Sequence, residues 1–172
     1  MIKMLEPMNG EIEREAATTR RVLERVPAGK LGWKPHPKSM SLGQLAMHVA
    51  TIPGGISKIA QADEFEINPA NFVPPTPKST EEILAALDTS VQAAQQYLCE
   101  VSESAATGNW RLTFQGKEVL AMPRAVMLRS IMLNHCITIA GSCRCTCDCL
   151  TFPYRQSMAP VRTKIPLAEA EE

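Results

Sequence analysis

The 172-residue chain has no net charge, few aromatic side chains and no long apolar run. Lysine and arginine together number 18 and so do aspartate and glutamate, so no net positive field attracts a polyanion. No stretch approaches the roughly 18 consecutive apolar residues of a membrane-spanning helix, and the N-terminal segment turns acidic before a signal core forms. These absences argue against nucleic acid and membranes as partners and predict a cytoplasmic protein.

The rest of the composition is that of a folded protein. Hydrophobic residues make up 45% of the chain and charged residues 21%, so there is enough apolar surface to bury a core. The length suits one domain better than two.

The spacing of apolar residues predicts four helices. Intervals of three and four residues place the first over residues 5–26 and the third over residues 79–101. The second runs over residues 41–59 with a kink at Pro53, and capping-box patterns begin both the second and the third. Pro123 suits the first turn of a fourth helix, because its missing amide hydrogen costs nothing there.

Two other segments are not predicted as helices. Residues 62–78 are rich in proline and are expected to form a long crossing loop, and residues 110–119 alternate in the manner of a short extended excursion. Four apolar stripes are hidden most simply by packing together. The predicted fold class is therefore all-α, a four-helix bundle with a long crossover and no convincing sheet.

Two of the three histidines, His48 and His135, lie on predicted helices. His48 shares the inward face of its helix with Leu45 and Ile52. On spacing alone, an inward histidine is more often a hydrogen-bonded core residue than a metal ligand. His36 lies between two prolines and is interpreted as a loop residue.

Two motifs carry a family resemblance. The segment WKPHPKSMSLGQLAMHVA over residues 33–50 and the sequence Leu133-Asn134-His135 resemble the DinB-like family of four-helix bundles. The resemblance implies an up-down-down-up bundle, a homodimer, and a divalent metal ion (zinc, nickel or iron) held by three histidines. Two of these positions match His48 and His135. The third follows the second by one helical turn, and here that position is Ile139.

Five of the six cysteines crowd between residues 136 and 149, where the resemblance ends. A one-base shift of the reading frame explains both features. Regrouping each codon's third base with the next two bases turns residues 136–143 into Leu-His-His-His-Arg-Gly-Gln-Leu and residues 145–149 into Val-Tyr-Leu-Arg-Leu. These strings are similar to the ordinary end of the family. We interpret the tail as the product of a one-base deletion, or of a sequencing error, near codon 136.

This interpretation divides the chain into a helical domain over residues 1–142 and an atypical, poorly ordered tail over residues 143–172. Regular helix is expected to fade between residues 140 and 150. Only His48 and His135 remain as metal ligands, and two protein donors bind a divalent ion weakly. Taken at face value, the alternating cysteines could instead form a thiolate metal cluster, but their spacing differs from that of structural zinc sites.

Three functional hypotheses follow. By resemblance, the intact protein is a metal-dependent enzyme, either a transferase acting on a small-molecule thiol or a hydrolase, with metal-bound water or thiolate as the nucleophile. Trp33 would line the approach to the metal, and no catalytic residue is assigned. The alternative is a non-catalytic helical scaffold that dimerises. The third hypothesis is that the chain is a non-functional remnant of a working gene.

Overall fold

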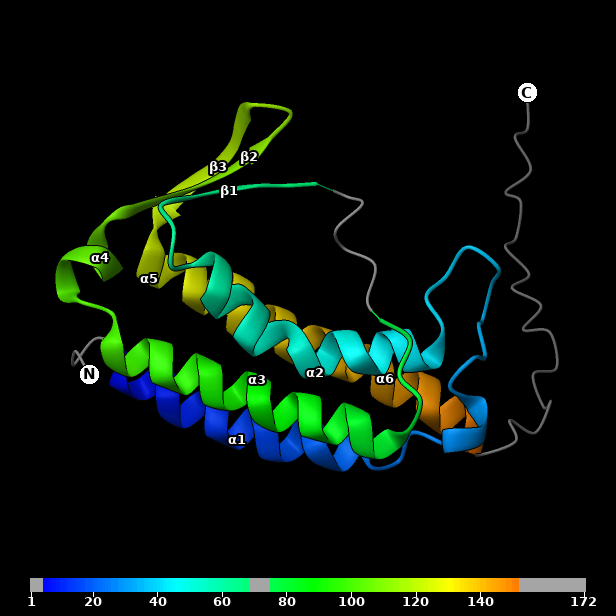
Figure 1. The fold of residues 1–172 in the computed structure, drawn as a ribbon. Coiled ribbons are helices and arrows are strands. Elements are labelled where there is room, and N and C mark those ends of the chain that lie inside the picture. The colour runs from blue at the N-terminus through cyan, green and yellow to red at the C-terminus, as the bar shows by residue number, and fades with distance from the viewer. Residues whose placement is uncertain (1–4, 69–74, 152–172) are drawn as a thin grey trace, which may run out of the picture.

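The computed structural model describes residues 5–68 and 75–151, and it is mostly helical (Figure 1). Three of its long helices are α1 (Glu6–Leu23), α2 (Leu42–Ile59) and α3 (Thr80–Glu100). A further long helix begins as α5 (Arg124–Met127), passes through a π-helical segment (Leu128–Leu133) and continues as α6 (Asn134–Thr151). The helices predicted from apolar spacing are thus present, with ends that differ by a few residues.

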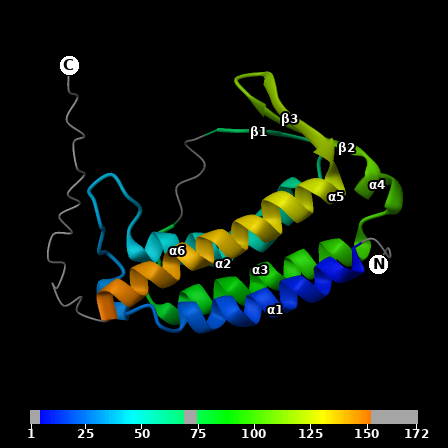
Figure 2. The same ribbon diagram turned by 180° about the vertical axis from the view of Figure 1, so that it is seen from behind.

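The four long helices pack side by side. α3 contacts both α1 and α2, and α6 contacts the same two helices from the other side. Figures 1 and 2 show α1 and α6 running in one direction and α2 and α3 in the other. Because α2 and α3 are parallel neighbours, the chain between them has to return along their full length, which explains the long connection.

Local hydrogen bonds explain where two of the helices begin. At the start of α2, Ser41 Oγ accepts from the Gln44 amide and Gln44 Oε1 accepts from the Ser41 amide, so the predicted capping box is confirmed. At α3, Ser79 Oγ accepts from the Glu82 amide, but the Glu82 carboxylate accepts from the Lys78 amide instead of that of Ser79. The second capping box is therefore only half formed.

Buried side chains form two apolar clusters, one toward each end of the long helices. Each cluster takes residues from every long helix, so the core runs the length of the molecule. The sheet-end cluster contains Leu5, Ile12, Leu98, Trp110, Met127 and Met132, and the far-end cluster contains Leu23, Leu42, Met47, Ile83, Cys143 and Cys147.

A small three-stranded sheet corrects the expectation of a fold without one. Its strands are β1 (Glu64–Glu66), β2 (Asn109–Phe114) and β3 (Lys117–Pro123), with β1 parallel to β2 and β2 antiparallel to β3. Gln115 and Gly116 join β2 to β3, with φ values of 51° and 71°. Both values are positive, as a tight two-residue hairpin turn requires. The predicted extended excursion is therefore a hairpin.

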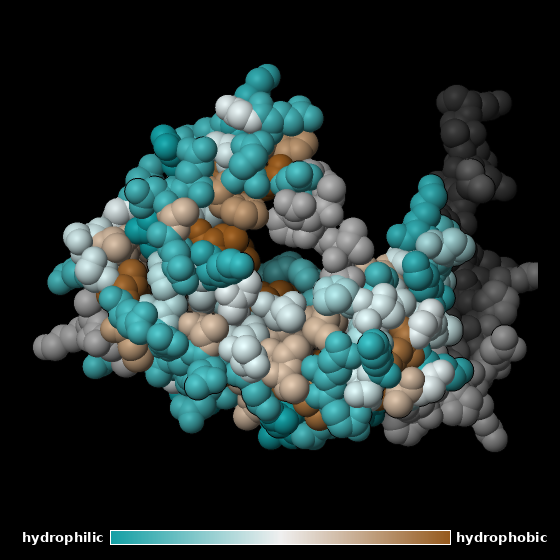
Figure 3. All heavy atoms as spheres, in the orientation of Figure 1, coloured by the Kyte–Doolittle hydropathy of each residue, from teal (hydrophilic) through white to brown (hydrophobic). Residues whose placement is uncertain are grey.

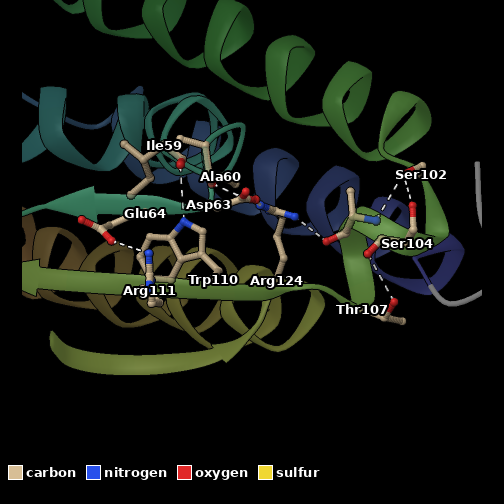
Figure 4. A network of polar contacts seen from close by, with 12 residues as sticks. Ile59, Ala60, Asp63, Glu64, Ser102, Ser104, Thr107, Trp110, Arg111 and Arg124 are labelled. Atoms are coloured by element: carbon tan, nitrogen blue, oxygen red, sulfur yellow. Dashed lines mark hydrogen bonds and ion pairs between the residues drawn. The ribbon is translucent and has the colours of Figure 1, made fainter.

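Arg124 joins the sheet to the helices (Figure 4). Its side chain is 4% exposed, and its guanidinium donates to the carbonyls of Ala62 and Ala105 and pairs with the Asp63 carboxylate. Its backbone amide donates to the carbonyl of Gly108, which follows the short helix α4 (Glu103–Thr107). One residue at the start of the last long helix thus holds α4 and the segment that enters β1.

The prediction that helix fades between residues 140 and 150 is wrong, because α6 continues to Thr151. Cys143 and Cys147 are 0% and 1% exposed and pack in the far-end cluster, together with the half-buried Ile139. Cysteine behaves here as a small hydrophobic residue, so the segment has an apolar face despite its unusual composition. The predicted poorly ordered tail is wrong for residues 143–151, and residues 152–172 lie outside the described part of the chain.

Within the described residues, one helical stretch, Arg124–Cys147, is long and apolar enough to cross a membrane by length and composition alone. The sequence expectation counted uninterrupted apolar runs, whereas this stretch qualifies by its mean hydropathy. A helix packed in a protein core meets the same criterion, and this one contacts α1 and α2 through α6.

Candidate metal centre

His48 on α2 and His135 on α6 lie against each other. Their Nε2 atoms are 3.4 Å apart, and the ring centroids are 5.6 Å apart with the ring planes at 75°. Both side chains are half-buried. The two histidines, which the DinB-like resemblance implied as metal ligands, are therefore neighbours in the fold, and their binding of a metal stays a prediction.

The backbone immediately before His135 is unusual. The π-helical segment Leu128–Leu133 ends where α6 begins, one residue before the histidine. A π-turn holds more residues than an α-turn, so it rotates every later side chain around the helix axis. The direction in which His135 points toward α2 therefore depends on this segment, which apolar spacing alone does not reveal.

The electrostatics of the pair favour uncharged imidazole at His48. Burial lowers the pKa of His48, and the nearby His135 lowers it further. Neutral imidazole is the form that binds a metal ion, because protonation occupies the nitrogen that would coordinate. The alternative is a direct hydrogen bond between the two rings, with one Nε2 as donor and the other as acceptor.

The other residues suggested by the sequence lie elsewhere. His36 is exposed in its loop, as predicted, and its Nδ1 accepts from the Lys38 amide. Trp33 is half-buried and packs against the far-end cluster, which is a packing role.

The widest grooves do not coincide with the histidine pair. One lies between α2 and α3 and is lined by small and polar residues, including Thr51, Gly54, Thr89 and Ser90, without histidine, cysteine or carboxylate. Figure 3 views the face that shows α2 and α3, where residues of intermediate hydropathy predominate while the hairpin is mainly hydrophilic. The groove between α2 and α3 therefore offers no metal-ligating histidine, cysteine or carboxylate, and the titratable side chain in its lining is Lys58.

Comparison with known proteins identifies the family of the chain. A family model described as the DinB superfamily matches residues 11–127. The chain belongs to the DinB superfamily. A crystal structure of a DinB-like protein from Bacillus cereus ATCC 10987 has the same fold with a TM-score of 0.59; it is 21% identical, and the likeness covers 80% of this chain and 85% of that one. No curated protein matches the chain significantly.

The DinB match contains His48 and ends before His135 and the cysteine-rich segment. The three-histidine site implied by the DinB-like resemblance does not fit the residues present. Among the described residues, no group of three or more histidine, cysteine or carboxylate side chains converges on one point. Position 139 carries isoleucine, which packs with the far-end cluster.

Cys136 does not supply the missing donor. Its side chain lines a core cavity together with Ile12, Val49 and Leu133, and the lining of that cavity includes neither histidine. Burial raises the pKa of the Cys136 thiol to about 12, so the thiol is uncharged at neutral pH. The site therefore consists of two imidazoles.

His48 is expected to titrate below its ordinary value near 6.5 in an NMR pH titration. His135→Ala should raise the pKa only part of the way back, because burial is the larger cause and remains. Between the pKa of His48 in the folded chain and its ordinary value, this group binds more protons in the unfolded chain than in the folded chain. The free energy of unfolding should therefore fall as the pH drops through that window, and a His48 pKa at or above 6.5 contradicts this account.

Proposed function

We propose that this DinB-superfamily chain is an up-down-down-up four-helix bundle with an incomplete divalent-metal site, descended from a metal-dependent thiol transferase or hydrolase. The observation that carries the proposal is the 3.4 Å approach of His48 Nε2 to His135 Nε2 from two different helices. The proposed ion is zinc, nickel or iron, all of which accept imidazole ligands. The proposed setting is a cytoplasmic homodimer acting on a small-molecule substrate, with a thiol as the first candidate.

We further propose that the residues after His135 come from a shifted frame. The burial pattern of α6 supports this. Among residues 134–147 of α6, Cys143 and Cys147 are the two most buried side chains, and the regrouped reading has leucine at both positions. The same reading has glutamine at position 142, where the chain is exposed. Leucine buries more apolar surface than cysteine, so the regrouped residues suit the inward face better than the present ones.

The test is the metal content of two purified proteins, measured by elemental mass spectrometry. One is the present chain, and the other carries the regrouped residues at positions 136–143 and 145–149. We expect close to one metal ion per chain only in the second protein, because only it supplies a third imidazole one helical turn after His135. Turnover of an activated thiol acceptor by the second protein would distinguish a transferase from a scaffold.

Two variants serve as controls. His48→Ala should abolish metal binding by the restored protein, whereas His36→Ala, in an exposed loop, should not. Stoichiometric metal in the present chain that disappears with His48→Ala would contradict the proposal of an incomplete site. Absence of metal from both proteins would contradict the proposed ancestry.

A further inference from the structure

Cys143 and Cys147 form a second group of metal-ligating side chains, distinct from the histidine pair. They are one helical turn apart on α6, so their side chains lie on the same face. Both are buried, and a side-chain hydrogen bond links the two thiols. Cys145, between them in sequence, is exposed. The helix therefore separates this buried pair from the exposed Cys145.

The surroundings of the buried pair keep it uncharged and reduced. Its neighbours in the far-end cluster are apolar and include Leu42, Met47 and Ile83. The hydrogen bond that the Cys143 thiol donates to Cys147 and burial both raise the pKa of Cys143 above its ordinary value. Residues one turn apart on a helix have Cβ atoms about 5–6 Å apart, but a disulfide needs about 3.5–4.5 Å. Closing a disulfide would require α6 to unwind, whereas an ion between the two sulfurs spans the gap.

We propose that Cys143 and Cys147 form a buried two-coordinate site for a soft divalent d10 cation of the mercuric type. Each thiol loses one proton as its sulfur bonds to the ion, so two protons are released and no oxidation state changes. The dication and two thiolates together give a neutral complex, which an apolar cluster accommodates without an uncompensated charge. A monovalent ion such as Cu(I) would leave one negative charge buried there, which is costly.

Zinc does not suit the same site. Structural zinc takes four protein ligands, and the described residues bring no three histidine, cysteine or carboxylate side chains together. A soft ion that binds stably with two sulfur ligands does not need a third or fourth protein donor. The proposed site involves neither histidine, so it does not rest on the proposed DinB metal function.

A small surface pocket lies beside the far-end cluster, and neither cysteine of the pair lines it. It is lined by Thr146 of α6 and by Ser39, Met40 and Leu42 from the segment that begins α2. Leu42 also belongs to the far-end cluster, so the pocket reaches the edge of the apolar region that holds the thiols. Met40 is 40% exposed and places a soft thioether in this pocket.

The test compares two variants, each with one pair of cysteines at the same spacing on α6. The first keeps Cys143 and Cys147 and carries Cys99→Ser, Cys136→Ala, Cys145→Ser and Cys149→Ser. The second keeps Cys145 and Cys149 and carries Cys99→Ser, Cys136→Ala, Cys143→Leu and Cys147→Leu. Each is loaded with one equivalent of Hg(II), challenged with excess glutathione, desalted and analysed for mercury.

We expect the first variant to retain close to one Hg(II) per chain, with two sulfur neighbours by X-ray absorption, and the second to lose most of it. Circular dichroism confirms that both are folded. If the first variant is unfolded, thermal unfolding of the full chain replaces the retention assay. Hg(II) should then raise the midpoint of thermal unfolding of the present chain but not that of the Cys147→Leu variant. Equal loss from both variants, equal retention of Zn(II), or an unchanged midpoint with Hg(II) would overturn the proposal.

Discussion

Replacing Ile139 by histidine is expected to tighten Zn(II) binding to the chain by about 100-fold. The substitution adds a third imidazole one helical turn after His135, on the face of α6 that His135 shares. Zinc sites with four protein ligands contribute about 10–16 kcal/mol, or roughly 3 kcal/mol per donor, which corresponds to about 100-fold in affinity. Competition with a chromophoric chelator measures the change directly.

The matched control for this substitution is Ile137→His. Ile137 lies on the same helix two residues after His135, where a side chain faces a different direction, and it is 46% exposed. It adds the same imidazole without the required geometry, so Zn(II) binding should change little. Equal tightening by both variants would mean that any added histidine suffices and that position 139 has no special place in the site.

Ile139→His should change the free energy of unfolding in opposite directions without metal and with bound Zn(II). Without metal, the half-buried isoleucine is lost from the far-end cluster, which should cost roughly 1–2 kcal/mol of unfolding free energy. With Zn(II) in large excess over its Kd, ligand binding to the folded state should recover at least that amount. A thermal midpoint that falls in both states would show that the imidazole at this position does not reach the ion.

The long helices could be predicted from apolar spacing, whereas the pairing of His48 with His135 came from the DinB-like resemblance. Three- and four-residue apolar spacing reports the inward face of a helix. His48 was expected on that face, whereas it is half-buried and is not among the buried side chains of α2. The strand β1 was missed because three residues are too few to show an alternating pattern. The extension of α6 was missed because cysteine was taken as a sign of an altered tail, although two cysteines four residues apart continue an apolar face.

Arg124 was missed for a different reason. A single arginine after a proline has no distinctive spacing, and its burial depends on carbonyl groups that are brought to it by other segments. The sequence contained one signal of its role, because Arg124 interrupts an apolar run at the start of a helix that otherwise has few charges. Long charged side chains in such a position are exposed unless the fold supplies partners, and only the three-dimensional structure shows these partners.

Arg124→Gln is expected to lower the free energy of unfolding by roughly 3 kcal/mol, because the buried guanidinium loses its bonds to two carbonyls and its ion pair with Asp63 together. The affected groups are the carbonyls of Ala62 and Ala105, while Asp63 is 86% exposed and regains water. For a chain of this length, the thermal midpoint should fall by roughly 6–12 °C. Circular dichroism melts and chemical denaturation measure both quantities.

The control is Arg111→Gln on β2, which removes the same charge from an exposed ion pair. Arg111 lies 2.8 Å from Glu64, and both side chains are about half exposed, so its loss should cost less than about 1 kcal/mol. The contrast separates the buried hydrogen bonds of Arg124 from a general effect of charge near the sheet. Equal losses would mean that the sheet is held by its own strand pairing and that the last long helix does not need Arg124 to fix where it begins.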